Sequence, residues 1–250
     1  MDAKNDNGFK TLTVKEFLEE AEALYLPYVS IQQVIFSYNH DELNVLLLNF
    51  DNSDIYCLPG GYVKKKETLD DAAKRSLYER TSIKDIFLQQ FRTYGDLFRE
   101  EDNLFASLLT RIGGELPQNN FITQRKISVC YYSLVDETKV VPHNTDLHVK
   151  GYKWANINDL PKLFTQHREI IFAALAQMRN DIGQKNVASH LMNETFTMNE
   201  LQKLYEIIFQ KSFDRGNFQR RMLSLDVLER LEKQYDGSSH KAPYLYRFKD

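Results

Sequence analysis

The chain has 250 residues, 42% of them hydrophobic, with 32 Lys and Arg against 35 Asp and Glu and a formal net charge of −3. This size allows one large domain, or a medium domain followed by a small one, and the slightly acidic balance excludes a globally basic protein, so any nucleic-acid-binding surface must be a local patch. No apolar run approaches the roughly 18 residues of a membrane span or resembles a signal peptide, so we expect a cytoplasmic protein with no membrane partner.

The N-terminal part of the chain predicts a helix followed by strands. Thr13 and Glu16 form a capping box ahead of apolar residues at helical spacing, which predicts a short helix and lead-in over residues 1–28. Runs rich in β-branched and aromatic residues then indicate strands. These runs are residues 31–38, 44–50, 55–58, 86–94, 126–135 and 152–157. A helix predicted over 166–182 completes an α/β sandwich with a mixed sheet, which we assign to residues 29–182.

Three residues of this region could carry chemistry, but their contexts favour structural roles. Cys57 and Cys130 lie in strand-like runs without CxxC spacing, so buried reduced thiols are favoured over metal ligands or a disulfide. His167 stands at the start of the helix predicted over 166–182. We interpret it as a helix-start residue whose hydrogen bonds are satisfied locally, rather than as a ligand.

Residues 60–83 read GGYVKKKETLDDAAKRSLYERTSI, two glycines followed by an amphipathic helix. Gly61, Glu67 and Arg75 follow a Leu-Pro-Gly sequence at G-x5-E-x7-R spacing, which resembles the Nudix box, G-x5-E-x7-R-E-U-x-E-E-x-G-U with U an aliphatic residue. In hydrolases of that family the helix glutamates hold Mg²⁺ against a diphosphate, since a hard cation prefers oxygen ligands. The alternative is a charged surface helix without a site.

The box departs from the family pattern at its metal ligands. Aligned from Arg75, the glutamate positions are Ser76, Glu79 and Arg80, which share one helix face, and the usual glycine is Ser82. The charge of that face sums to zero, so we expect no catalytic residues, no metal and no cofactor. The resemblance implies that Gly61 permits a tight loop and that Glu67 pairs with Arg75 to tie this loop to the helix.

We therefore expect a Nudix fold kept as a binding pocket, in which Arg80 takes a phosphate, carboxylate or sugar hydroxyl. Two arginines of the predicted strands, Arg92 and Arg125, could face the cleft or pair with surface carboxylates. The candidate ligand-binding residues are Gly60, Gly61, Arg75, Ser76, Glu79, Arg80, Arg92 and Arg125.

The C-terminal region changes character after a predicted linker at 183–195. Thr197 caps a helix over 198–210, KSFD forms a turn, and a second helix spans 217–225. YLYRF, at 244–248, predicts the returning strand of a hairpin. This order is typical of a winged helix, which we assign to residues 196–250, where ten Lys and Arg face eight Asp and Glu.

The second helix of this region could contact DNA. A 100° spacing places Arg220 opposite the apolar side, with Asn217 and Ser224 also outward and Arg221 at the flank. Arginine is the usual partner of guanine, and lysines add sequence-independent affinity. The candidate DNA-binding residues are Lys211, Arg215, Asn217, Arg220, Arg221, Ser224, Lys241 and Arg247. The alternative is an Arg-Arg pair on a solvated helix face.

Nearly the whole chain resembles the Nudix-related transcriptional regulators of bacteria. The marks are VIF at 34–36, the degenerate box, RTYGD at 92–96, SVCYYSLV at 128–135, the Trp154 strand, the helix through His167, the FTMNELQKLYEIIFQKSFDRGNFQRRM run and the final LYRF. The resemblance implies that the second helix and wing bind operator DNA while a metabolite in the Nudix cleft, ADP-ribose or in some relatives a pentose, controls the affinity. Two departures are a longer loop after Asp96 and a wing with only His240 and Lys241 as its basic segment.

The sequence thus predicts a bacterial, ligand-responsive regulator that binds operator DNA and senses a sugar or ADP-ribose-like effector. A module this small gains specificity by pairing with a twin, so we expect a homodimer on a palindromic site. Two alternatives stay open. One is a residual Mg-dependent hydrolase of ADP-ribose or another nucleoside-diphosphate sugar that uses Glu79, and the other is a protein-interaction module.

Overall fold

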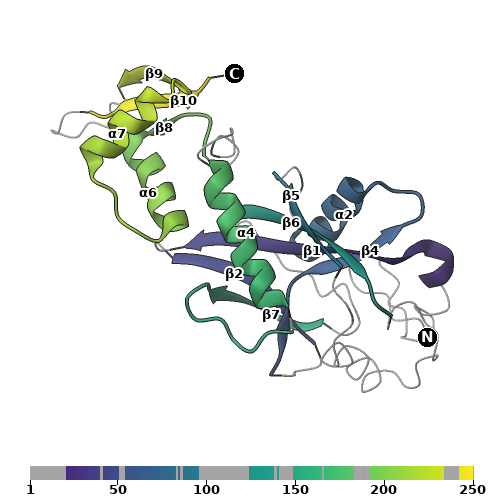
Figure 1. The fold of residues 1–250 in the computed structure, drawn as a ribbon. Helices are drawn as coiled ribbons and strands as arrows, with labels where there is room; N and C mark the ends of the chain where they lie inside the picture. The colour runs from purple at the N-terminus through teal and green to yellow at the C-terminus, as the bar shows by residue number, and fades with distance from the viewer. Residues whose placement is uncertain are drawn as a thin grey trace. The chain divides into compact units, whose positions relative to one another are not determined.

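The fold is seen in a computed structural model of the chain (Figure 1). The structure describes residues 21–39, 42–50, 54–82, 84, 87–95, 124–137, 140, 149–164, 166–182, 188, 192–233 and 242–249. Two compact units result, Met1–Ser37 with Asn44–Ala174, and Tyr38–Leu43 with Leu175–Asp250. Among the described residues, no helix is long and apolar enough to cross a membrane. The domain limits predicted from the sequence remain predictions.

The first unit is built on a seven-stranded mixed sheet. Its strands are β1 (Tyr25–Asn39), β2 (Glu42–Phe50), β3 (Tyr56–Cys57), β4 (Gly60–Lys64), β5 (Gln89–Tyr94), β6 (Ile127–Asp136) and β7 (Val149–Asn156). The strand path is β3-β2-β1-β6-β5, with β4 paired to β1 and β7 paired to β2. All six strand-like runs of the sequence therefore lie in one sheet.

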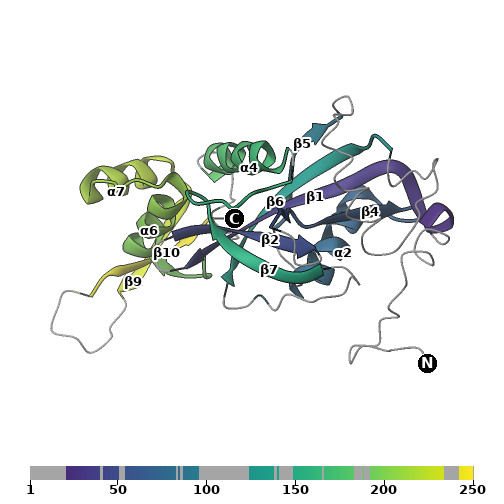
Figure 2. The ribbon, with the colours of Figure 1, turned by 90° about the horizontal axis from the view of Figure 1, so that it is seen from below.

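Helices cover both faces of this sheet, which confirms the expected α/β sandwich. They are α2 (Leu69–Thr81) and α4 (His167–Ile182), and Figure 2 shows them on opposite sides of the strands. Ala72 and Ala73 of α2 pack against Ile31 of β1. The alternate β1 residues Val34 and Phe36 are equally buried, as both faces must be when helices cover each side.

Two elements differ from the sequence-based expectation. First, β1 begins at Tyr25, before the predicted start at residue 31. Its early part shifts register between Tyr25 and Ser30 and contains Pro27 and Tyr28, the latter with a φ of 64°, so it is an irregular strand that alternation rules do not detect. The helix predicted after Thr13 lies outside the described residues, except for 21–24, which are helical.

Second, Gly60 and Gly61 belong to β4, so the expectation of a tight glycine loop at Gly61 is wrong. Gly60 pairs with Gln32 and Gly61 with Ile31 across the β1–β4 ladder. A Cβ on Gly60 would stand 2.5 Å from the Ile31 carbonyl oxygen, which no side chain tolerates. Here the glycine therefore allows close approach of two backbones rather than a turn.

The second unit has the element order of a winged helix, as predicted. Its elements are β8 (Phe196–Thr197), α6 (Met198–Phe209), α7 (Arg215–Ser224), β9 (Leu228–Lys233) and β10 (Tyr244–Phe248). The strands form a sheet in the order β8-β10-β9 (Figure 1). α6 begins at Thr197 with a reciprocal capping box to Glu200. Most of the predicted linker at 183–195 lies outside the described residues.

Candidate functional site

Helix α2 carries the degenerate Nudix box, and local chemistry explains both of its ends. The Thr68 hydroxyl accepts a hydrogen bond from the Asp71 amide at 3.1 Å, which caps the N-terminus, and Asp70 and Asp71 favour the positive end of the helix. The helix ends at Ser82, which adopts the left-handed conformation with a φ of 60°. This is the position at which the full box has glycine, and its backbone conformation gives the reason.

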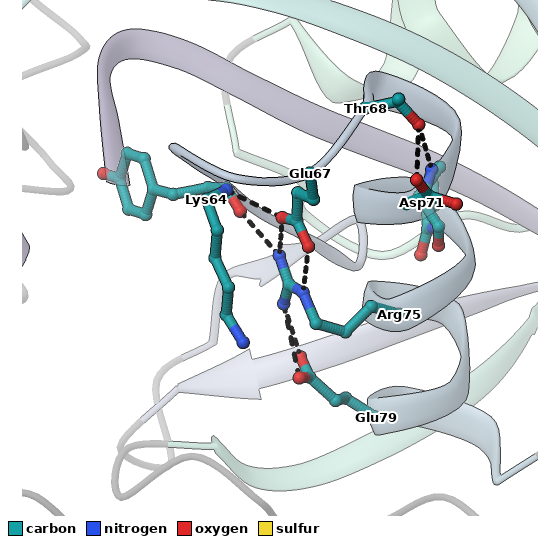
Figure 3. Close-up of polar contacts among 9 residues, drawn as sticks. Lys64, Glu67, Thr68, Asp71, Arg75 and Glu79 are labelled. Carbon is teal, nitrogen blue, oxygen red and sulfur yellow. Dashed lines mark hydrogen bonds and ion pairs between the residues drawn. The ribbon is translucent and has the colours of Figure 1, made fainter. Parts of the chain in front are cut away.

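The Arg75 guanidinium lies between two carboxylates (Figure 3). It donates to Glu67 from Nε at 3.0 Å and from Nη2 at 2.7 Å, and to Glu79 from Nη1 at 3.0 Å. Nη2 also donates to the Tyr62 carbonyl oxygen of β4 at 2.8 Å. The implied ion pair between Glu67 and Arg75 is confirmed, and Glu79 is a second partner.

Electrostatics in this network favour the charged forms. Burial alone would raise the pKa of Glu67, but hydrogen bonds from Arg75 and from the Lys64 amide, together with the Arg75 charge, hold that pKa below its ordinary value. Burial would likewise lower the pKa of Arg75, but its bonds to Glu67 and the charge of Glu79 raise it above the usual range. We call Glu67, Arg75 and Glu79 the box network.

The other box positions do not join this network. Ser76 is buried, and no hydrogen-bond partner for its hydroxyl lies within the described part of the chain. A Cβ on Gly61 would stand 3.3 Å from Ser76 Oγ, so Ser76 fits against β4 because Gly61 is small. Arg80 belongs to α2, and its side chain lies outside the described set. Within that set, no three His, Cys, Asp or Glu side chains gather as a metal site would require.

The two arginines predicted near the cleft lie in different settings. Arg92 is an exposed residue of β5 whose guanidinium carbon lies 4.8 Å from the centre of the Tyr94 ring. Arg125 is also exposed and donates a hydrogen bond to the Gly95 carbonyl oxygen. It precedes β6 and is not a strand residue as predicted, since the strand begins at Ile127. No described contact connects either arginine to the box network.

His167 is a structural residue with a distant partner. Its Nδ1 accepts a hydrogen bond from the Leu58 amide at 2.9 Å, 109 residues away in sequence, so the expected local satisfaction is wrong. Burial lowers the pKa of His167 to about 4, so the ring is neutral near pH 7. Neither cysteine forms a disulfide; Cys130 is buried, which raises its pKa to about 12, but Cys57 is half-buried rather than buried as predicted.

The connection between α6 and α7 is held by side chains that the sequence analysis missed. Gln202 donates to the Phe213 carbonyl oxygen at 2.9 Å, and the Phe213 amide donates to Glu206 at 2.8 Å. Arg179 of α4 donates to the Ile208 carbonyl oxygen at the end of α6 at 2.8 Å. The sequence shows the i, i+4 spacing of Gln202 and Glu206, but this spacing does not reveal their hydrogen bonds to the turn between α6 and α7.

Helix α7 buries one side and exposes its polar side. Phe218 and Met222 are buried. The predicted contact residues Arg215, Asn217, Arg220, Arg221 and Ser224 are all exposed, as the helical projection requires. Arg220 donates from Nη2 to Asn217 Oδ1 at 2.6 Å. Within the described ranges, no carboxylate lies within 4.0 Å of the guanidinium groups of Arg215, Arg220 or Arg221.

The remaining predicted DNA contacts are less uniform. The Lys211 ammonium lies 5.6 Å and 5.1 Å from the ring centres of Phe209 and Phe213, which orient it beside the turn. Arg247 of β10 is paired with Glu229 of β9 at 2.7 Å. Lys241 lies outside the described residues. Two further cations were not predicted as contacts, Arg230 and Lys233, whose charged groups lie 4.6 Å and 5.2 Å from the centre of the Tyr244 ring.

Comparison with known families finds two domains along the chain. Residues 33–175 match the model of the NUDIX domain. Residues 188–248 match the model described as the NrtR DNA-binding winged helix domain. Together the two matches reproduce the order that the structure shows, an α/β sandwich followed by a winged helix.

Individual proteins are similar over most of this chain. The ADPR responsive transcriptional repressor NtrR of Acinetobacter baylyi is 26% identical over 229 residues, covering 89% of this chain and 82% of that protein. The crystal structure of Shewanella oneidensis NrtR complexed with a 27mer DNA has a TM-score of 0.65 at 22% identity, covering 89% of this chain and 94% of that one. A MutT/nudix family protein from Enterococcus faecalis has a TM-score of 0.64 at 18% identity, covering 95% and 94%.

Proposed function

Because the chain belongs to the Nudix family, we propose that its Nudix domain senses a small effector and that its winged helix binds operator DNA, making it a transcriptional regulator. The C-terminal match to an NrtR DNA-binding winged helix domain supports the second half of this proposal. The similarity to a repressor described as ADPR responsive supports the first half.

The observation that carries the proposal is the exposed face of α7. Three arginines, Arg215, Arg220 and Arg221, lie on this helix with no carboxylate partner among the described residues. Such cations can contact phosphates and base edges without first breaking an internal ion pair. Their position after the α6–α7 turn is that of a recognition helix, which enters the major groove. We propose the remaining predicted residues of this domain, Lys211, Asn217, Ser224, Lys241 and Arg247, as further contacts.

The chemistry of the box supports binding rather than hydrolysis. Two of the three glutamate positions are Ser76 and Arg80, and the remaining glutamate, Glu79, is bound to Arg75 at 3.0 Å. To hold a metal, Glu79 would have to exchange a partly buried cation for the ion. We propose that the box network instead holds the segment between β4 and α2 in place, and that this segment and α2 form one wall of an effector pocket. Its proposed contacts are Gly60, Gly61, Ser76, Arg80, Arg92 and Arg125.

The effector is a sugar or an ADP-ribose-like molecule. It must bind the DNA-competent and DNA-incompetent forms with different affinities, because a ligand with equal affinity for both shifts neither. The regulator acts as a homodimer, since two copies read two half-sites and multiply the specificity of one small module.

A gel-shift assay with DNA from upstream of its own and neighbouring genes tests the function. We expect a complex that depends on sequence and weakens as salt increases, and that responds to ADP-ribose or a pentose. Absence of any sequence-dependent complex would contradict the proposal.

The competing hydrolase function has its own assay. It predicts Mg²⁺-dependent turnover of ADP-ribose or a nucleoside-diphosphate sugar that Glu79→Gln abolishes. We expect no such turnover in the wild-type protein, because Glu79 is held by Arg75.

A further inference from the structure

We infer that Asn217 and Arg220 form one recognition unit that reads guanine in the major groove. This inference rests on the proposed function, since it specifies which base the exposed face of α7 recognises. It assigns Arg220 as the residue that contacts the base and Asn217 as the residue that positions it.

The geometry begins with a single hydrogen bond. Arg220 Nη2 donates to Asn217 Oδ1 at 2.6 Å, one helical turn apart on the exposed side of α7. A guanidinium has five donors and no acceptor, so the amide atom of Asn217 that accepts its hydrogen bond must be the oxygen. The bond therefore uses one of the two lone pairs of Asn217 Oδ1 and sets the orientation of the amide.

The helix start holds Asn217 in place for this role. The Asp214 carboxylate accepts a hydrogen bond from the Asn217 backbone amide at 2.9 Å and caps α7. On the opposite side of the helix, Phe218 and Met222 are buried in the domain core. The backbone that carries the unit is thus fixed, while the two polar side chains stay exposed.

The chemistry of base edges then distinguishes adenine from guanine. An asparagine reads adenine with two bonds, using its oxygen as acceptor for N6–H and its nitrogen as donor to N7. Because Arg220 already donates to Oδ1, adenine N6–H would have to share that oxygen and lie beside a cation, so this pair of bonds is disfavoured. Arg220 presents donors only, and guanine is the base that offers two acceptors, O6 and N7, in the major groove. With one N–H of Nη2 donated to Asn217, Arg220 still has N–H donors for both O6 and N7 of guanine.

Ser224, the next polar residue along this face, adds no competing donor. Its hydroxyl donates to the Arg221 carbonyl oxygen at 2.8 Å, so only oxygen lone pairs remain on its outer side. Among Asn217, Arg220 and Ser224, the guanine preference is therefore assigned to Arg220.

The test is a selection from randomised duplex DNA with the full-length protein, followed by competition between the selected site and versions with each guanine changed to adenine. Wild-type protein should select at least one guanine per half-site. Arg220→Ala should lower the preference for that guanine over adenine by about 10- to 100-fold. Arg220→Lys should retain sequence-independent binding but lose most of this preference, because lysine lacks the planar fork.

Asn217→Ala separates the two roles. It should keep guanine as the preferred base at the same position while lowering the preference severalfold, because Arg220 loses its support. Arg168→Ala removes an exposed arginine of α4 that lies over the Phe172 ring and should leave DNA binding unchanged. Circular dichroism melting checks that each variant is folded.

The outcomes distinguish the inference from the function on which it rests. If wild-type protein forms no sequence-dependent complex, the proposed function itself fails. If it forms one but Arg220→Ala and Arg220→Lys keep the full guanine preference, or if Asn217→Ala removes a preference for adenine, the recognition unit is wrong.

Discussion

Arginines in α2 and α7 are used in opposite ways. In α2, Arg75 is bound by Glu67 and Glu79, and the side chains of Arg75 and Glu67 are only 21% and 13% exposed. In α7, the arginines are exposed and have no carboxylate partner within the described residues. A partly buried pair cannot release its charge to a ligand without leaving an unpaired group behind, whereas an exposed cation can bind a new partner at little cost.

The two helices therefore differ in role: the arginine of the α2 network supports the fold, and the arginines of α7 are available to bind a partner. The charges of Glu67, Arg75 and Glu79 pair with one another inside the fold, so they are not available for a metal. The winged helix keeps its charge available for an external polyanion.

Arg75→Ala should lower the free energy of unfolding by about 3 kcal/mol, because it leaves the Glu67 carboxylate poorly solvated and unpaired. Urea denaturation followed by circular dichroism measures the change. Lys74→Ala, at the preceding and exposed position of the same helix, is the matched control and should change the free energy of unfolding by no more than about 0.5 kcal/mol. Equal losses in the two variants would show that the box network contributes no special stability.

Gly60→Ala should destabilise the protein by about 2–3 kcal/mol, because the added methyl group meets the Ile31 carbonyl oxygen between β1 and β4. The strand Gly151→Ala is the control, since nothing lies within 4 Å of its Cβ position. Thermal denaturation of both variants provides the comparison. A tolerated alanine at Gly60 would mean that β1 and β4 do not approach as closely as described.

His167 should make stability depend on pH, since it is buried without a charge. The folded-state pKa of about 4 lies below the ordinary value of 6.5, so the unfolded chain binds the proton more readily. The stabilisation by the neutral ring is fully present above pH 6.5 and is lost as the pH falls towards 4. The loss amounts to about 2 kcal/mol at pH 5. Between pH 7.5 and pH 5 the free energy of unfolding should decrease more for wild type than for His167→Gln. Equal decreases in the two proteins would refute this role of His167.

Thr197→Ala should cost about 1 kcal/mol in the winged helix, because the reciprocal bonds between Thr197 and Glu200 cap α6. Thr197→Ser keeps the hydroxyl and is the control, expected to lose much less. Calorimetric melting of both variants measures the difference. If serine and alanine are equally destabilising, the loss comes from the methyl group rather than from the cap.

The fold was predictable where patterns are local. The winged-helix order followed from the Thr197 cap, the two amphipathic helices and the final YLYRF strand, and it was confirmed. The β4 strand was missed because GGYVK lacks the β-branched content of a strand and Gly60 needs space that only the neighbouring β1 backbone defines. The β9 sequence LERLEK was missed for a related reason, since charges dominate its exposed face.

The candidate site was predictable at one level only. Box spacing anticipated the pair between Glu67 and Arg75, but sequence alone could not show that Arg75 also takes Glu79, because both a metal and an arginine suit that carboxylate. The partner of His167 was equally hidden, since Leu58 is brought to it by the sheet rather than by the local chain. The contacts that sequence patterns did not predict are those between segments that only the tertiary fold brings together.

The most direct test of the contrast is the salt dependence of DNA affinity, measured by fluorescence anisotropy with a site from the selection. Wild type is compared with Arg215→Ala/Arg221→Ala, which removes two exposed cations of α7. We predict that the logarithm of the association constant falls linearly with the logarithm of salt concentration, and that the double variant has a slope smaller by about 0.9 for each phosphate contact removed. Identical affinity and slope for both proteins would contradict the claim that α7 is the DNA-binding surface.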